Sequence, residues 1–494
     1  MLPKRLVPSE ISRLADPRLL REYAYIDGRW RGAADGAAIA VHDPADGEVL
    51  GSVARLGAAE AREAVAAAKA AWPAWRALAP QARAALIRAW HDAILANRED
   101  LARLMTLEQG KPIAEARGEI DYAASFVAWY AEETKRLNVE SVTSHLPEAE
   151  MIVRREPIGV AALVTPWNFP SAMITRKAAA ALAAGCTVVV HPSMETPLSA
   201  LALAELAERA GLPAGVFNVV TGEAPEIVEA WCAEPDVRLV SFTGSTEIGR
   251  KIAALCAPGV KRLVLELGGH APFIVFPDAD LETAVAGGLA AKFATSGQDC
   301  LAANRFYLHR DIHDRFVGAF AAGVRALKVG PGLDEDSDIG PLIHERALAK
   351  CEAQVEDALA RGARLLVGGR RHKAGPLFYE PTVLVDVPAD ARIMREETFG
   401  PVAAFARFDD EAAVLAAAND TEYGLAAYLY TEDYRRISRM GRALEYGMVA
   451  VNRAKITGAP IPFGGVKQSG LGREGARHGM EAFTEIKYLC LDAA

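Results

Sequence analysis

One cysteine of this chain stands in a setting that suits a nucleophile. Cys300 closes the sequence Gly297-Gln298-Asp299-Cys300, a turn of small and polar residues that follows a predicted helix ending near Thr295. Such a turn can expose a thiol, whose thiolate form is the reactive species. A free cysteine is more often a small buried apolar residue, but polar neighbours fit a core strand poorly. On these residues alone both interpretations stay open.

An asparagine occupies a second segment, whose backbone is restricted. Residues 165–170 read TPWNFP, so two prolines bracket the end of a predicted strand and fix the loop that contains Asn168. At the carboxyl edge of a parallel sheet, where ligands bind, the Asn168 amide can donate a hydrogen bond to a developing oxyanion. An ordinary turn hydrogen bond is the simpler role for an asparagine.

A glutamate lies among apolar residues at the end of another predicted strand. Residues 265–269 read LELGG, and burial at this place would raise the pKa of Glu266. A carboxylate with a raised pKa is a usable general base near neutral pH. A structural salt bridge is the alternative role for this carboxylate.

Two glycine-containing segments could bind phosphate groups. Residues 242–246 read FTGST and precede a predicted helix, so Ser245 and the following backbone N–H groups could receive a pyrophosphate at the helix N-terminus. A plain helix cap is the alternative. Residues 470–475, GLGREG, match GxGxxG in form, but they follow no apolar strand and open no βαβ unit, so we assign them no nucleotide-binding role.

Alternating strands and helices must position these segments. Ala/Leu-rich amphipathic helices are predicted from residue 58 to about residue 138, and short strands at 151–154 and 482–491. After residue 158, strands are predicted at 160–164, 186–190, 216–220, 238–242 and 262–267, with helices at 172–184, 197–210, 225–233 and 247–255. This alternation predicts a mostly parallel sheet covered on both faces. A second α/β block follows over 272–451, with strands at 273–276, 365–367 and 383–385.

Charge and composition exclude several classes of protein. The chain has 55 Lys plus Arg against 64 Asp plus Glu, a net charge of −9, which argues against nucleic-acid partners and anionic membranes. The longest apolar run, 178–190, is too short to span a bilayer, and residues 1–31 lack the features of a signal peptide. Six cysteines lie far apart without metal-ligand spacing. We therefore expect a soluble cytoplasmic protein with reduced thiols and no metal.

Six ordered motifs together resemble the NAD(P)-dependent aldehyde dehydrogenase superfamily. The resemblance extends from about residue 24 to the C-terminus, and the motifs are TPWNFP at 165–170, FTGST at 242–246, LELGG at 265–269, GQDC at 297–300, EETFGP at 396–401 and PFGGVKQSG at 462–470. Residues 171–177, SAMITRK, and the tail from 470 to 488 are most similar to succinate-semialdehyde dehydrogenases.

The resemblance implies a fold and an assembly. It implies a Rossmann-like parallel-sheet cofactor domain over 20–138 and 158–266, a second α/β catalytic domain over 267–462, and a small β oligomerisation arm over 139–157 and 480–494. A homodimer or homotetramer is expected by the same analogy.

The resemblance also implies the roles of individual residues. Cys300 is the nucleophile, Asn168 and the Cys300 backbone N–H form the oxyanion hole, Glu266 is the general base, and Lys177 lies beneath the site. Arg176 is expected to bind the substrate. NAD or NADP is expected at the following residues: Thr165, Trp167, His191, Ser193, Ser245, Leu267, Glu397 and Phe399.

Departures from the family pattern leave the substrate and the cofactor open. His191 replaces the usual ribose-binding lysine, and Met194 replaces an acidic residue that often selects NAD; a partly protonated His191 could favour the 2′-phosphate of NADP at lower pH. Ala294 replaces a second arginine expected for a dicarboxylic semialdehyde, with Arg453 and Lys455 as replacement cations. A larger or aromatic aldehyde, transfer to coenzyme A and a catalytically silent relative are the alternatives. Glu266 favours hydrolysis to a free acid.

Overall fold

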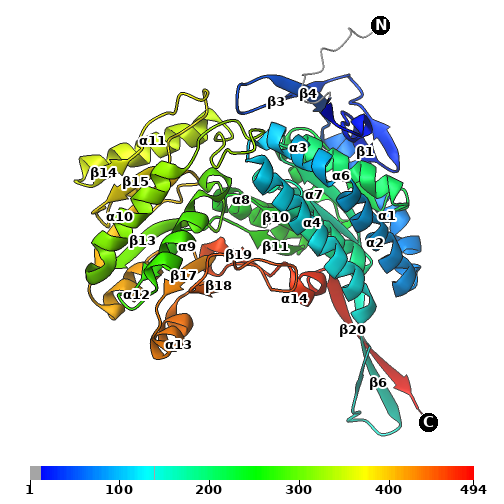
Figure 1. Ribbon diagram of the computed structural model, residues 1–494. Helices are drawn as coiled ribbons and strands as arrows, with labels where there is room; N and C mark the ends of the chain where they lie inside the picture. The colour runs from blue at the N-terminus through cyan, green and yellow to red at the C-terminus, as the bar shows by residue number, and fades with distance from the viewer. Residues whose placement is uncertain (1–12, 138, 494) are drawn as a thin grey trace.

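Two sheets with helices on both faces form the body of the protein (Figure 1). The structure is a computed structural model that describes residues 13–137 and 139–493. A three-stranded arm extends from the body, and a two-stranded hairpin lies near the N-terminus. The predicted α/β class with parallel sheets is confirmed.

The first sheet has eight strands in the order β19-β11-β10-β7-β8-β9-β1-β2. Its central strands pair in parallel, and β1, β2 and β19 are antiparallel additions at the edges. The bounds are β1 Ala24–Ile26, β2 Arg29–Arg31, β7 Val160–Thr165, β8 Thr187–Pro192, β9 Phe217–Val219, β10 Val237–Thr243, β11 Arg262–Glu266 and β19 Gly470–Leu471.

Helices cover both faces of this sheet because its buried strands are apolar throughout. In β7, Ala161 and Leu163 face one core while Val160, Ala162 and Val164 face the other. The first core is closed mainly by α2 Pro80–Ala96, α3 Arg98–Gln109, α4 Ile113–Glu133, α5 Ala172–Ala184 and α6 Pro197–Arg209. The second is closed by α1 Ala58–Ala77, α7 Ala224–Ala233 and α8 Thr246–Cys256.

The second sheet has seven strands in the order β14-β15-β16-β13-β12-β17-β18, parallel except for β14. Its strands are β12 Ala271–Val275, β13 Ala303–His309, β14 Arg364–Val367, β15 Thr382–Val385, β16 Val402–Phe408, β17 Ala426–Tyr430 and β18 Met448–Val451. Helices α9 Leu281–Phe293 and α10 Arg310–Ala326 pack on one face. Helices α11 Glu345–Ala360, α12 Glu411–Asn419 and α13 Tyr434–Ala443 pack on the other.

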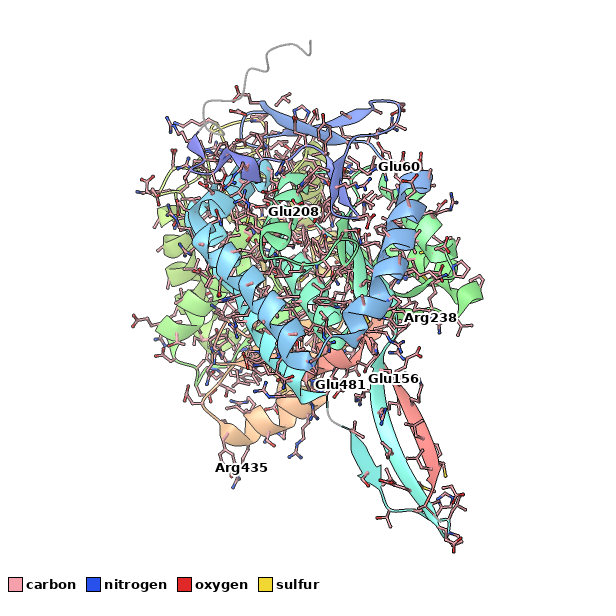
Figure 2. All side chains as sticks on the ribbon, turned by 90° about the vertical axis from the view of Figure 1, so that its right-hand side faces the viewer. Glu60, Glu156, Glu208, Arg238, Arg435 and Glu481 are labelled. Carbon is pink, nitrogen blue, oxygen red and sulfur yellow. The ribbon has the colours of Figure 1, made fainter. Side chains whose placement is uncertain are left out.

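The arm is an antiparallel sheet of β5 Glu140–Val142, β6 Ala149–Pro157 and β20 Thr484–Asp492, joined to the body near α14 Ala476–Glu481. Figure 2 shows it projecting away from the body, with Glu156 and Glu481 labelled near its base. The hairpin of β3 Ala38–His42 and β4 Val49–Ala54 was not predicted from the sequence.

The strands of the two large sheets and the arm fall within the predicted domain ranges, apart from β19. The domain limits themselves stay a prediction. Among the helices of the described ranges, none has the length and apolar character of a membrane span.

Candidate active site

The three segments singled out for chemistry meet where the two large sheets approach each other. The Asn168 and Glu266 loops follow the carboxyl ends of β7 and β11, while Cys300 lies just before the amino end of β13. Asn168 and Cys300 line one cavity of about 340 Å³, together with Leu267 and Gly268 from the glutamate loop. Of the predicted site residues, those that line this cavity are Trp167, Asn168, Ser245, Leu267, Cys300, Glu397 and Phe399.

A strained turn presents Cys300, the candidate nucleophile. Thr295, Ser296 and Gly297 have φ values of 51°, 56° and 73°, so three successive residues of the 3-10 turn Ala294–Gly297 are left-handed. A side chain at Gly297 would also collide with the carbonyl of Gly400, so this position requires glycine. The turn leaves Cys300 partly exposed at the cavity. The predicted turn is present, but it begins earlier than the sequence indicated because α9 ends at Phe293 and not near Thr295.

The electrostatic surroundings of Cys300 favour the neutral thiol. Burial raises the pKa of Cys300 well above its usual value, the Asp299 carboxylate adds to the rise, and Arg176 opposes it. A thiol of this kind keeps its proton in the resting protein. A nucleophilic role for Cys300 therefore requires that the thiol first lose this proton.

Asn168 is held with its amide nitrogen toward the nucleophile loop. Its Nδ2 donates to the backbone carbonyl of Gln298 at 3.0 Å, two residues before Cys300. A carbonyl only accepts hydrogen bonds, so this bond fixes the amide orientation. The amide has a second N–H group that can donate to an oxyanion in the cavity.

Glu266 is buried and unpaired. Its side chain is 2% exposed, and neither carboxylate oxygen accepts a hydrogen bond from the described residues. Gly464, with φ 152°, lies beside it, and a methyl group there would stand 2.8 Å from Glu266 Oε1. Burial raises the pKa of Glu266 well above its usual value, Glu474 raises it further, and Arg176 and Lys177 oppose the rise. This confirms the predicted burial of the carboxylate.

An ion cluster of three side chains lies beneath the site. Lys177 Nζ donates to Ser241 Oγ at 2.9 Å and to Glu474 Oε1. Arg176 Nε lies 2.6 Å from Glu474 Oε2. Burial alone would raise the pKa of Glu474, but Lys177 and Arg176 together lower it, so Glu474 is ionised. Sequence reasoning missed Glu474, which follows β19 in the segment 470–475.

Arg176 keeps part of its guanidinium available. Its side chain is wholly buried, it stacks 4.1 Å from the Phe463 ring, and Nη2 donates to Met173 Sδ at 3.1 Å. Its Nη1 has no hydrogen-bond partner among the described residues. A buried guanidinium with an unused N–H group can bind an anion.

The opposite part of the cavity has groups that can bind the phosphate, ribose and ring of a nucleotide. Ser245 caps α8, so the free N–H groups of the first turn of this helix face an anion-binding position. Trp167 and Phe399 meet edge to face at 5.5 Å, which makes an apolar wall for a planar ring. Glu397 Oε1 accepts from Gly269 N at 2.9 Å, and burial raises the pKa of Glu397 to about 7. A carboxyl group held in this way can bind ribose hydroxyls.

The residues expected near the adenosine ribose lie at the carboxyl end of β8. His191 Nδ1 donates to the Val220 carbonyl at 2.9 Å, and burial lowers the pKa of His191 to about 4. The ring is therefore neutral near pH 7, and the expectation of a partly protonated His191 that favours a 2′-phosphate is wrong. Ser193 bonds to Glu195, and Thr165 is buried at the end of β7.

Three further charged residues, which the sequence did not identify, hold the site loops from the start of α4. They are Lys111, Glu115 and Glu119. Their role is visible only in the structure, from hydrogen bonds to backbone groups far away in the sequence.

Within 13–137 and 139–493, no cluster of three or more His, Cys, Asp or Glu side chains could hold a metal ion.

Comparison with known proteins gives one consistent family. The sequence profile described as the aldehyde dehydrogenase family matches residues 30–489. The chain is 55% identical to the succinate-semialdehyde dehydrogenase [NADP(+)] of Escherichia coli, over 97% of this chain and 99% of that protein. It is 56% identical to the non-phosphorylating aspartate-semialdehyde dehydrogenase of Halomonas elongata, over 98% of each. The crystal structure of succinate-semialdehyde dehydrogenase from Burkholderia pseudomallei matches with a TM-score of 0.96 at 52% identity, over 97% of this chain and all of that one. This chain therefore belongs to the aldehyde dehydrogenase family and is an NAD(P)-dependent oxidoreductase.

Proposed function

We propose that this enzyme oxidises a short aldehyde bearing a carboxylate at its far end, a semialdehyde such as succinate semialdehyde, to the free acid. The observation that carries the proposal is Arg176: a buried guanidinium, with an unpartnered Nη1, close enough to Cys300 to lower its pKa. A substrate carboxylate bonded to Nη1 would leave the aldehyde carbon directed toward the thiol. The two relatives named above act on aldehydes of this kind.

The first step is addition of Cys300 sulfur to the aldehyde carbon. The thiol loses its proton to solvent in the cavity as the carbon–sulfur bond forms, and the carbonyl oxygen becomes an oxyanion. Asn168 Nδ2 and the Cys300 backbone N–H donate to this oxygen. The bond from Asn168 to Gln298 keeps the amide in place before the substrate arrives.

Collapse of the tetrahedral adduct leaves an acyl group on the sulfur. A bound nicotinamide would accept the hydride that the carbon loses in this oxidation. Trp167 and Phe399 would wall the nicotinamide, Glu397 would hold its ribose, and Ser245 with the α8 N-terminus would receive the pyrophosphate. Thr165, His191, Ser193 and Leu267 complete the cofactor site in this proposal.

Glu266 then activates water against the thioester. Its carboxyl group must give up a proton to act as a base, and Arg176 and Lys177 lower its pKa against the effect of burial. Ionised Glu266 removes a proton from water, which attacks the acyl carbon and releases the acid with Cys300 regenerated. A dehydrogenase that acylates coenzyme A would not need this carboxylate.

The length of the substrate is less restricted than its charge. Ala294 is exposed at the end of α9 and brings no cation to the substrate. Arg453 and Lys455 are also exposed, and Arg453 Nε donates to the Lys455 carbonyl at 2.8 Å. We therefore assign the carboxylate to Arg176 and expect semialdehydes longer than four carbons to be accepted.

We further propose a cytoplasmic homodimer or homotetramer. The arm of β5, β6 and β20 projects from the body with exposed apolar side chains at Ile486 and Tyr488, which a second subunit would cover. All six cysteines are free thiols, in keeping with a reducing compartment.

An aldehyde panel tests the function. Steady-state kcat/KM with NAD and with NADP would be measured for four- and five-carbon semialdehydes, for butanal and pentanal of matched length, and for benzaldehyde. We expect the semialdehydes to exceed their neutral counterparts by at least tenfold. A preference for benzaldehyde would support the larger aldehyde, dependence of product on coenzyme A would support acyl transfer, and no reduction with any aldehyde would support a silent relative.

A further inference from the structure

A buried ion pair outside the reacting groups grips the backbone of the Asn168 loop. Lys111 Nζ donates to Glu119 Oε2 at 2.5 Å and to the backbone carbonyl of Asn168 at 2.8 Å, and lies 4.2 Å from the Phe169 ring. Both charged side chains are 1% exposed. Glu119 Oε1 also accepts from the backbone N–H groups of Ser171 and Ala172, at 3.0 and 3.2 Å.

The same stretch of chain also holds the nucleophile loop. Glu115, one turn before Glu119 on α4, accepts from the backbone N–H of Thr295 at 2.8 Å. Thr295 begins the left-handed turn that presents Cys300. Residues four apart lie on one face of a helix. The first turns of α4 therefore hold both loops whose separation defines the oxyanion site.

We propose that Lys111 and Glu119 are positioning residues that fix Asn168 at its working distance from Cys300. The inference rests on the oxyanion role given to Asn168 in the proposed function. Lys111 binds the carbonyl of the very residue whose amide must meet the oxyanion, and Glu119 fixes the two backbone N–H groups just beyond the loop. A donor displaced by about 1 Å loses much of its contribution to the rate, on the order of 100-fold in unfavourable cases.

Stability alone does not explain this ion pair. Two charges with almost no exposure lose their hydration, and such a pair is often replaceable by apolar side chains without loss of stability. The ion pair makes three hydrogen bonds to backbone groups around Asn168, and a pair of apolar side chains could make none of them. The bonds therefore point to control of loop geometry.

The main test is the double variant Lys111→Met with Glu119→Gln, which removes both charges together. The amide oxygen introduced by Glu119→Gln can still accept from the two backbone N–H groups, whereas the bond to the Asn168 carbonyl is lost. We expect the rate constant of the first burst of reduced cofactor to fall about 10- to 100-fold, with the KM for NAD(P) changed less than twofold. Lys111→Arg keeps the charge pair with Glu119 but changes the group that binds the Asn168 carbonyl, so it should give a smaller fall and provides a measurement if the double variant folds poorly.

An Asn168→Ala background separates positioning from a general effect on folding. If Lys111 and Glu119 act through Asn168, the same changes should slow the burst less than twofold further when the amide is absent. An equal fall in both backgrounds, or no fall with Asn168 present, would overturn the inference. If Asn168→Ala alone leaves the burst unchanged, the oxyanion role fails and this inference fails with it; if Asn168→Ala slows the burst but the charge variants do not, only this inference fails.

A matched control removes another ion pair. Arg21 Nη2 binds the buried carboxylate of Glu205, a residue of α6, at 2.5 Å. Arg21→Met should leave the burst rate unchanged, and thermal midpoints of all variants would be recorded beside the kinetics. A burst slowed equally by Arg21→Met would attribute the effect to lost ion pairs in general and would contradict the proposal.

Discussion

Replacing Glu266 by Gln should separate the two halves of the reaction. Gln keeps the size and shape of the side chain but cannot accept a proton from water. Addition to Cys300 and oxidation do not use this carboxylate in the proposed order of steps, whereas deacylation does. The variant should therefore release one equivalent of reduced cofactor per subunit and then stall with an acyl group on the sulfur.

The expected size of the effect follows from the setting of the carboxyl group. Loss of a general base typically costs about 100- to 10,000-fold, or about 3 to 5 kcal/mol on the deacylation barrier. The folded protein should tolerate the change, because Glu266 oxygens accept no hydrogen bond within the described residues and burial raises its pKa. A raised pKa means that the folded state holds the proton more tightly than the unfolded state, so the wild type loses stability as pH rises above the usual glutamate pKa. The variant lacks this loss and should be the more stable protein at alkaline pH.

Stopped-flow fluorescence of reduced cofactor, at enzyme concentrations near that of the substrate, measures burst and steady state together. Mass spectrometry of the stalled variant should find the acyl mass on the peptide that contains Cys300. Glu108→Gln is a matched control, since Glu108 is another fully buried glutamate with a raised pKa, but it caps α6 through the N–H groups of Leu198 and Ser199. Normal steady turnover of Glu266→Gln, or loss of its burst, would refute the assignment.

Three further predictions concern substrate, cofactor and stability. Arg176→Lys should lower kcat/KM for succinate semialdehyde about 10- to 100-fold, which corresponds to about 1.5 to 3 kcal/mol for a charge-assisted bond. The same change should alter kcat/KM for butanal less than threefold. Equal losses for both aldehydes would mean that Arg176 has only a structural role. His191→Asn should leave the pH dependence of the NADP-to-NAD ratio of kcat/KM unchanged between pH 6 and 8, because burial holds the pKa of His191 near 4; a ratio that rises toward pH 6 only in the wild type would contradict this. Burial raises the pKa of Glu108 from 4.5 to about 8. The wild type should therefore lose roughly 2 to 3 kcal/mol of stability between pH 6 and 8 from this group, and calorimetry should find a smaller loss of stability in Glu108→Gln. Identical losses in the two proteins would contradict the raised pKa.

Strong local patterns made most of the fold predictable. Helix α5, Ala172–Ala184, has the bounds predicted from its Ala-rich sequence, and β8 was displaced by only one or two residues. The hairpin of β3 and β4 escaped notice because β3 has one buried residue in five and β4 contains Gly51 and Ser52, which are weak strand formers. Strand β19 has two residues and is defined only by its pairing with β11, so no local sequence pattern predicts it.

The site residues divide in the same way. Cys300, Asn168 and Glu266 stand out because Cys300 follows a predicted helix, Asn168 follows a predicted strand and Glu266 lies near the end of one, each in an unusual local sequence. Glu474 meets Lys177 across 297 positions of the chain, and Lys111 meets Asn168 across 57. Glu474 lies in a Gly-rich tail and Lys111 lies in a break between two helices. Neither local sequence predicts those contacts. Residues that act through tertiary contacts alone need the structure.

The charges of the site are arranged so that the permanent ions pair with each other. Lys111 pairs with Glu119, and Glu474 is shared by Lys177 and Arg176. Glu266 and Cys300, the two groups that change protonation in the proposed mechanism, have no such partner among the described residues, and burial raises the pKa of each. A fixed ion pair next to either group would lock its charge state and remove its ability to exchange a proton. Because Arg176 lowers the pKa of Glu266, a substrate carboxylate bound at Arg176 would offset that influence and raise this pKa, so that less Glu266 is ionised but the ionised form is a stronger base toward water.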